Sequence, residues 1–61
     1  MDEKLLDIEE AAEFLGLAEK TLYSYTSARK IPHVKIGGRV LFPKSMLWEW
    51  VQDHIVTPAT K

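Results

Sequence analysis

Four apolar residues near the N-terminus have the i, i+3, i+4, i+7 spacing of one helix face: Ile8, Ala11, Ala12 and Leu15. Asp7 precedes this stripe and Glu10 follows three residues later, which is the form of a capping box. Gly16 comes directly after the last apolar position, where a left-handed residue commonly ends a helix. The pattern predicts a short first helix from about Ile8 to Leu15.

A second amphipathic segment follows a tight connection and predicts a helix from Glu19 to about Ser27. Leu22, Tyr25 and Thr26 share one face at helical spacing, and we expect Tyr25 to join the core. The other faces carry the outward candidates Lys20, Thr21, Tyr23, Ser24 and Ser27. The small pair Ala11–Ala12 lets the two helices cross closely. Two short helices joined through a glycine-containing turn are typical of a helix-turn-helix.

The segment after Pro32 changes to a strand-like pattern. Pro32 stops helical structure. Residues 33–36 and 39–42 are rich in β-branched and other apolar side chains, and they flank the pair Gly37–Gly38. Such runs around paired glycines predict a β-hairpin.

The register of this hairpin has two possible forms. A two-residue turn pairs Ile36 with Arg39. A three-residue loop instead pairs Ile36 with Val40 and Val34 with Phe42, and it places these four apolar residues on one face. Because a one-residue slip moves every side chain to the opposite face, we favour the three-residue loop, which leaves Arg39 in the loop and free to reach outward.

Pro43, Lys44 and Ser45 predict the start of a last helix, since proline and serine are common at that position. Its predicted inner stripe is Leu47, Trp50, Val51 and His54. Trp48 lies off this stripe. It either covers the segment Leu5–Leu6, which we prefer, or is an exposed anchor for a partner. Residues 57–61 have no pattern and predict a flexible tail after a single domain of residues 1–56.

Charge is strongly separated along the chain, although the net charge is only −1. Residues 1–19 carry seven acids and one lysine, for a net charge of −6, and residues 45–61 carry −1. Between them lie six cationic side chains and no acid: Lys20, Arg29, Lys30, Lys35, Arg39 and Lys44. A concentrated cationic surface attracts polyanions whatever the net charge is, whereas the alternative is a solvated, lysine-rich face.

Composition limits the remaining classes of function. The 61 residues are 46% hydrophobic and contain no cysteine, so we expect one small folded domain without a disulfide or thiolate metal site. No apolar run approaches the roughly 20 residues needed to cross a bilayer. His33 and His54 lack the neighbours of a metal site. We expect a cytoplasmic protein. Since no catalytic grouping is visible, we also expect that it is not an enzyme and uses no cofactor.

Two stretches occur together in order and at characteristic spacing, EEAAEFLGL at residues 9–17 and KIPHVKIGGR at residues 30–39, and KSMLWEWV closes the pattern at residues 44–51. Over residues 6–51 the chain resembles the excisionase-like winged helix-turn-helix family, which is related to the DNA-binding domains of mercury-resistance-type regulators. Arg29 stands where that family often has glycine, and Ala18 where it often has a serine or threonine cap.

The resemblance implies an α+β, mostly helical fold in the order helix, helix, β-hairpin wing, helix. It also implies that the protein binds double-stranded DNA, with the second helix in the major groove and the wing on the minor groove or the backbone. Members of this family are recombination directionality factors, small transcriptional regulators and DNA-binding subunits in phage packaging. The implied protein partners are an integrase or recombinase, or further copies bound cooperatively on DNA.

On this basis we assign roles to the outward side chains. Lys20, Thr21 and Ser24 are the predicted base readers, since lysine donates to guanine and the threonine methyl contacts thymine. Arg29 and Lys30, after the second helix, are the predicted backbone contacts. The Tyr23 hydroxyl either reaches a phosphate or does not. Ser27 and the wing residue Lys35 complete the predicted DNA-binding residues. If four cations contact phosphates, the logarithm of the binding constant should fall against the logarithm of salt with a slope of about −3.6.

Two cations keep alternative interpretations. Arg39 either enters a narrow minor groove, where negative potential is enhanced, or stands in open solvent. Lys44 either contacts a phosphate or contacts nothing. Another class of function is a protein-interaction module that keeps the fold without binding DNA, as the acidic first helix and Trp48 suggest.

Overall fold

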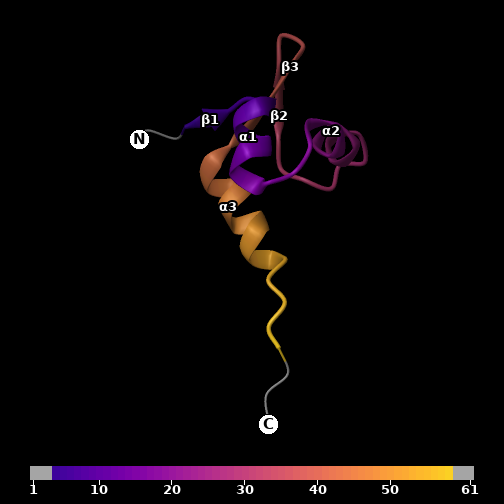
Figure 1. The fold of residues 1–61 in the computed structure, drawn as a ribbon. Helices are drawn as coiled ribbons and strands as arrows, with labels where there is room; N and C mark the ends of the chain where they lie inside the picture. The colour runs from indigo at the N-terminus through magenta and orange to yellow at the C-terminus, as the bar shows by residue number, and fades with distance from the viewer. Residues whose placement is uncertain (1–3, 59–61) are drawn as a thin grey trace.

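The computed structural model describes residues 4–58 of the chain. The elements follow one another as β1 (Leu5–Leu6), α1 (Ile8–Leu15), α2 (Glu19–Ser27), β2 (Val34–Ile36), β3 (Arg39–Pro43) and α3 (Lys44–Asp53). In Figure 1, α1 lies between α2 and β1, α3 runs away below it, and the β2–β3 hairpin projects beyond the helices. This order confirms the predicted α+β, mostly helical winged helix-turn-helix.

The first helix has the capped ends that its sequence predicts. The Asp7 carboxylate accepts a hydrogen bond from the Glu10 backbone N–H at 2.8 Å, and the Glu10 carboxylate accepts one from the Asp7 N–H at 3.1 Å. At the other end Gly16 has a φ of 70°, and its N–H donates to the Ala12 carbonyl at 2.8 Å. Residue chemistry therefore determines both boundaries of α1.

The sheet has three antiparallel strands in the order β1-β3-β2. Leu6 of β1 lies opposite Phe42 of β3, and the Lys44 N–H donates to the Lys4 carbonyl at 2.9 Å. Sequence analysis did not predict β1, because two residues are too few to show an alternating pattern. This strand forms only because the tertiary fold brings it beside β3.

The hairpin has the two-residue turn, and the predicted three-residue loop is wrong. Ile36 pairs with Arg39 and Lys35 pairs with Val40, so Arg39 begins β3 and is not a loop residue. Gly37 and Gly38 have φ values of 56° and 84°. A two-residue type I′ turn requires positive φ at both central positions, which paired glycines adopt without strain.

The apolar pattern misled the register because the tip of the hairpin stands beyond the core (Figure 1). In the observed register Lys35 shares a face with Val40 and Phe42, while Ile36 is on the other face and remains 56% exposed. Phe42 is fully buried further down the strand. Because no helix covers the tip, the turn geometry decided the register.

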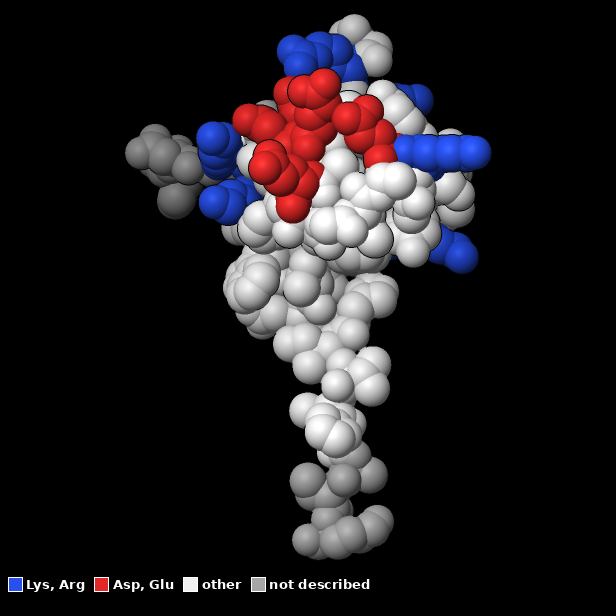
Figure 2. Space-filling view, viewed as in Figure 1, with Lys and Arg blue, Asp and Glu red and all other residues white. Residues whose placement is uncertain are grey.

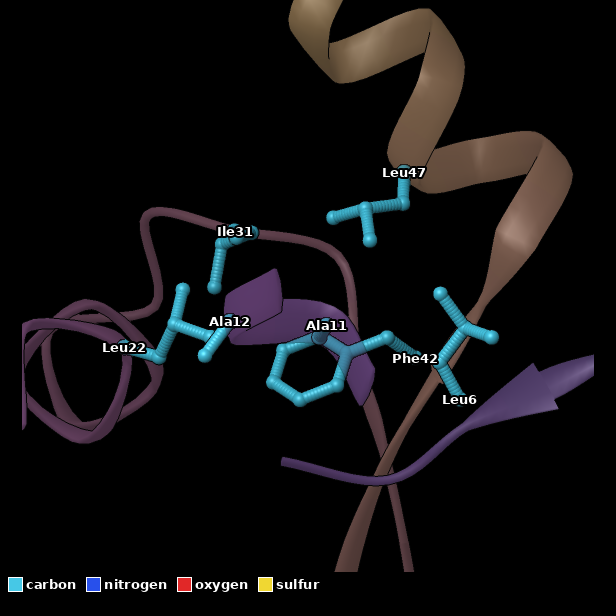
Figure 3. Packing of buried hydrophobic residues seen from close by; sticks show 7 residues of the cluster. All are labelled: Leu6, Ala11, Ala12, Leu22, Ile31, Phe42 and Leu47. Carbon is cyan, nitrogen blue, oxygen red and sulfur yellow. The ribbon is translucent and has the colours of Figure 1, made fainter. Parts of the chain in front are cut away.

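The core is a cluster of side chains drawn from β1, β3, all three helices and the segment after α2 (Figure 3). Its seven members are Leu6, Ala11, Ala12, Leu22, Ile31, Phe42 and Leu47. Ala11 is fully buried and Ala12 is 8% exposed, which confirms that these small residues pack between neighbouring elements. Tyr25 packs against this cluster from α2 and is half-buried, as expected of a core residue.

In α3 the predicted inner stripe is confirmed at Leu47, Trp50 and Val51 but is wrong at His54. Leu47 is fully buried and Trp50 and Val51 are half-buried, whereas His54 is exposed. The helix ends at Asp53, so His54 lies just past the last turn that meets the core. Its ring contacts that of Trp50, with centroids 4.3 Å apart and the planes tilted by 43°.

Trp48 has a neighbour that the sequence did not reveal. Its ring meets Phe14 of α1 edge-on, with centroids 6.3 Å apart, and it remains 52% exposed.

Beyond α3, residues 55–58 have no regular structure. The predicted tail reaches residues 59–61, which lie outside the described residues. Within residues 4–58, no helix has both the length and the apolar character to span a bilayer.

Candidate nucleic-acid interface

The outer face of α2 offers polar side chains to a ligand. Leu22 and Thr26 are buried toward the core, and the Thr26 hydroxyl donates to the Tyr23 carbonyl at 2.9 Å. Thr21 is half-buried at the flank of the helix. The exposed predicted residues are Lys20, Tyr23, Ser24 and Ser27. Burial of one face thus leaves the other free to meet a groove of DNA.

The end of α2 is a Schellman turn built on an arginine. The Arg29 N–H donates to the Thr26 carbonyl at 3.1 Å, and the Lys30 N–H donates to the Tyr25 carbonyl at 2.9 Å. Arg29 has a φ of 58°, the left-handed conformation that glycine usually provides in this motif. The turn leaves Arg29 and Lys30 exposed at the end of the helix.

Trp50 of α3 holds this turn from the other side. Its Nε1–H donates to the Lys30 carbonyl at 2.8 Å, and its ring lies 6.1 Å from that of Tyr25. The link joins two positions twenty residues apart in the chain. Sequence analysis placed Trp50 in the core but missed this positioning role, since a long-range bond to a carbonyl leaves no signal in the pattern.

An open hollow of about 710 Å³ separates α2 from the β2–β3 wing. Among the predicted site residues, it brings together Tyr23, Ser27, Arg29 and Lys35. The rest of its wall is Thr26, Ile31, Pro32, His33 and Val40. None of these nine residues is acidic, so the hollow combines two cations with several hydrogen-bonding groups.

His33 is a residue of this hollow that sequence analysis missed. The sequence pattern shows only that it lacks the neighbours of a metal site. The sequence did offer one signal for this place in the hollow. His33 lies between Pro32, which ends the helical part, and β2, and a residue there must lie in the angle between α2 and the wing.

Arg39 lines a neighbouring hollow beside the turn of the wing. That hollow of about 220 Å³ is bounded by Asp7, Ile8, Tyr23, Gly38, Arg39 and Val40. Tyr23 is 51% exposed and belongs to the walls of both hollows. Its side chain therefore connects the cation of the wing with those beside α2.

Lys44 does not join the other predicted residues. Its Nζ lies 5.9 Å from the centre of the Phe14 ring, and it shares a third hollow with Lys4, Leu6, Glu10 and Glu13. Two carboxylates in that hollow make it a poor place for a phosphate. A DNA contact by Lys44 remains a prediction without a supporting neighbour.

Three acidic side chains lie over α1, while Glu19 stands in the first turn of α2. Glu9, Glu10 and Glu13 are exposed, and in Figure 2 the acidic side chains gather in the middle of the face while basic ones stand around its edge. This face would repel a polyanion. An anionic polymer would meet less repulsion on the side of α2 and the wing than over α1.

Residues 4–58 contain no group of three or more His, Asp or Glu side chains able to hold a metal ion. The chemistry that this surface supports is reversible binding of an anionic polymer by cations and hydroxyl groups.

Comparison with known proteins agrees with this geometry. Residues 5–54 match the family described as a helix-turn-helix domain. No curated protein and no solved structure was found to match the chain. The match spans all six elements of the fold. The chain therefore belongs to this helix-turn-helix domain family, which includes excisionase-like helix-turn-helix domains and whose fold indicates DNA binding.

Proposed function

We propose that this protein binds double-stranded DNA in a sequence-dependent manner, with α2 in the major groove and the wing on the adjoining backbone or minor groove. One observation carries the proposal. The exposed face of α2 borders a hollow that contains Arg29 and Lys35 and no carboxylate. Phosphate contacts by such cations supply most of the affinity of a DNA-binding protein, because they release condensed counterions.

Within this proposal the side chains divide into two groups. Lys20, Thr21 and Ser24 at the start of α2 read base edges, each good contact discriminating by about 1–3 kcal/mol. The backbone contacts are Tyr23, Ser27, Arg29, Lys30 and Lys35, with Arg39 at the minor groove. So few base readers imply that one copy discriminates modestly, so cooperative copies or a partner protein complete the recognition.

The biological role that we favour is an excisionase-like recombination directionality factor that positions an integrase or recombinase on DNA. A small transcriptional regulator is the other role that the same surface supports. In either case the protein acts in the cytoplasm, without catalysis and without a cofactor. A complex with a recombinase on DNA that assembles only when this protein is added would separate the first role from the second.

Charge reversal tests the proposed surface. We expect the wild-type protein to bind generic duplex DNA at low salt. If four cations contact phosphates, the logarithm of its binding constant should fall against the logarithm of salt with a slope of about −3.6. Lys20→Glu and Arg39→Glu should each weaken binding at least tenfold, since each replaces attraction by repulsion at the DNA (about 1.4 kcal/mol or more). Fluorescence anisotropy over a salt series measures both quantities.

Lys4→Glu is the matched control, because Lys4 carries the same charge but lines the hollow beside Glu10 and Glu13. It should bind DNA nearly as the wild type does. If Lys4→Glu and Lys20→Glu weakened binding equally, only net charge would matter and the proposed surface would be wrong.

A second candidate function is a protein-interaction module, and the exposed ring pair Phe14–Trp48 favours it. Both rings are at least 40% exposed although they touch each other. Large exposed aromatic side chains are enriched at interfaces. A protein with this function alone would show no salt-sensitive DNA binding in the anisotropy experiment.

A further inference from the structure

The imidazole of His33 has a defined orientation at the hollow between α2 and the wing. Its Nδ1 lies 2.8 Å from the Ile31 carbonyl oxygen, and its ring lies 6.4 Å from that of Phe42. Since a carbonyl oxygen can only accept, Nδ1 carries the hydrogen. In the neutral ring Nε2 is then an acceptor, and protonation turns it into a second donor.

The charged and titratable groups around His33 all favour an anion. Arg29 comes from the end of α2 and Lys35 from β2, while Tyr23 and Ser27 of α2 contribute hydroxyl groups. Val40 of β3 and the 31–32 segment complete the wall without charge, and the hollow has no carboxylate among its lining residues. An acidic ligand is therefore the only kind of charged group that this wall attracts.

A phosphate oxygen has opposite interactions with the two forms of the ring. The lone pair on neutral Nε2 repels it, whereas the protonated ring donates a charge-assisted hydrogen bond. Histidine is the side chain that changes between these forms from about pH 5 to pH 8. The binding of phosphate beside Arg29 and Lys35 thus favours uptake of one proton from the solvent.

We propose that His33 is a phosphate-binding residue of this hollow, that its protonated Nε2 donates to the backbone phosphate held between Arg29 and Lys35, and that DNA binding is therefore proton-linked. The inference rests on the proposed function, because the phosphate is that of duplex DNA. It adds a ligand group that neither the charge pattern nor the family match assigns.

His33→Asn isolates the group in question. The asparagine amide can still donate to the Ile31 carbonyl in place of Nδ1, but it has no atom in place of Nε2. For the wild type we expect binding of a generic duplex to strengthen about fivefold from about pH 8 to about pH 6 at constant salt. The salt slope should also steepen by about 0.9, the value of one added phosphate contact. Both changes should be absent from His33→Asn.

His54→Asn is the matched control. The Nδ1 of His54 also lies 2.8 Å from a backbone carbonyl oxygen, that of Trp50, but this histidine follows α3 and does not line the hollow. This variant should keep the pH dependence of the wild type. The same pH dependence in His33→Asn as in the wild type would overturn the inference and leave the proposed DNA binding intact.

A second measurement does not depend on the fold of a variant. The ring protons of His33 in the wild-type protein, followed by NMR over a pH series, should titrate at higher pH when duplex DNA is bound. An unchanged midpoint would sink the inference. A wild-type protein that binds no DNA at either pH would contradict both the inference and the proposed function.

Discussion

Arg29 is a residue whose backbone geometry conflicts with its side chain. Both α1 and α2 end at a left-handed residue, but α1 uses Gly16 with a φ of 70° and α2 uses Arg29 with a φ of 58°. Among the described residues, Arg29 is the only one other than glycine with positive φ. A Cβ in this conformation costs about 1 kcal/mol or more. The position gains a cation at the edge of the hollow in return for that strain.

Replacing Arg29 therefore separates stability from binding. Arg29→Gly should raise the free energy of unfolding by about 1 kcal/mol, because it removes the strained Cβ. Arg29→Ala should bring no such gain, since alanine keeps that Cβ. Both variants lose the same charge and should bind DNA more weakly by a similar factor. Urea denaturation measures the first quantity and anisotropy the second; equal stability of the two variants would contradict the strain argument.

At the scale of an element, the hairpin shows turn geometry deciding against the apolar pattern. The turn Gly37–Gly38 lies beyond the helices, and a Cβ built at either glycine meets no atom within 4 Å. Space is therefore not what selects glycine there. The requirement is positive φ at both positions, and it sets the register that places Lys35 on the face of the hollow.

Two substitutions at Gly37 test this account. Gly37→Asn should change the free energy of unfolding by no more than about 0.5 kcal/mol, because Asn-Gly is the preferred type I′ pair. Gly37→Val should cost about 1–2 kcal/mol, since a β-branched residue resists positive φ. A Cβ at this position meets no atom within 4 Å, so a clash of the Cβ with a neighbouring residue cannot explain a difference. A valine variant as stable as the asparagine variant in urea denaturation would contradict the observed turn.

At the scale of the whole molecule, the two tryptophans of α3 contact different helices. Trp50 donates a hydrogen bond to the Lys30 carbonyl and its ring contacts that of Tyr25, and so it joins the turn after α2 to the core. Trp48, two residues earlier, contacts Phe14 of α1 and remains 52% exposed. The side of α2 and the exposed aromatic pair are therefore separate surfaces of one small domain.

These two tryptophans should respond differently to the same change. Trp50→Ala should lower the free energy of unfolding by about 3 kcal/mol, since it removes a half-buried ring and leaves the Lys30 carbonyl without its donor. Trp48→Ala should cost less than about 1 kcal/mol, because its ring has one edge contact and is largely hydrated. Thermal unfolding of both variants measures these two losses of stability. A large loss of stability in Trp48→Ala would mean that this ring is structural and would remove the support for a partner-binding surface.

Local signals made most of the elements predictable from the sequence. The capping box at Asp7 and Glu10, the left-handed Gly16 and the stripe of Leu22 and Thr26 depend on chemistry within a few residues, so their boundaries were confirmed. The separation of acidic and basic residues could also be predicted, because it is a property of the sequence itself. The outward face of α2 followed from the same periodicity.

The tertiary structure alone decided what depends on residues far apart in the chain. Strand β1 exists because β3 offers it an edge, and Trp50 reaches Lys30 only when the fold brings α3 beside the turn after α2. The hollow that gathers Tyr23, Arg29, His33 and Lys35, and the position of Lys44 outside it, likewise depend on how the wing meets α2. A one-dimensional pattern records which side chains share a face of one element, whereas a binding surface depends on which faces of different elements meet.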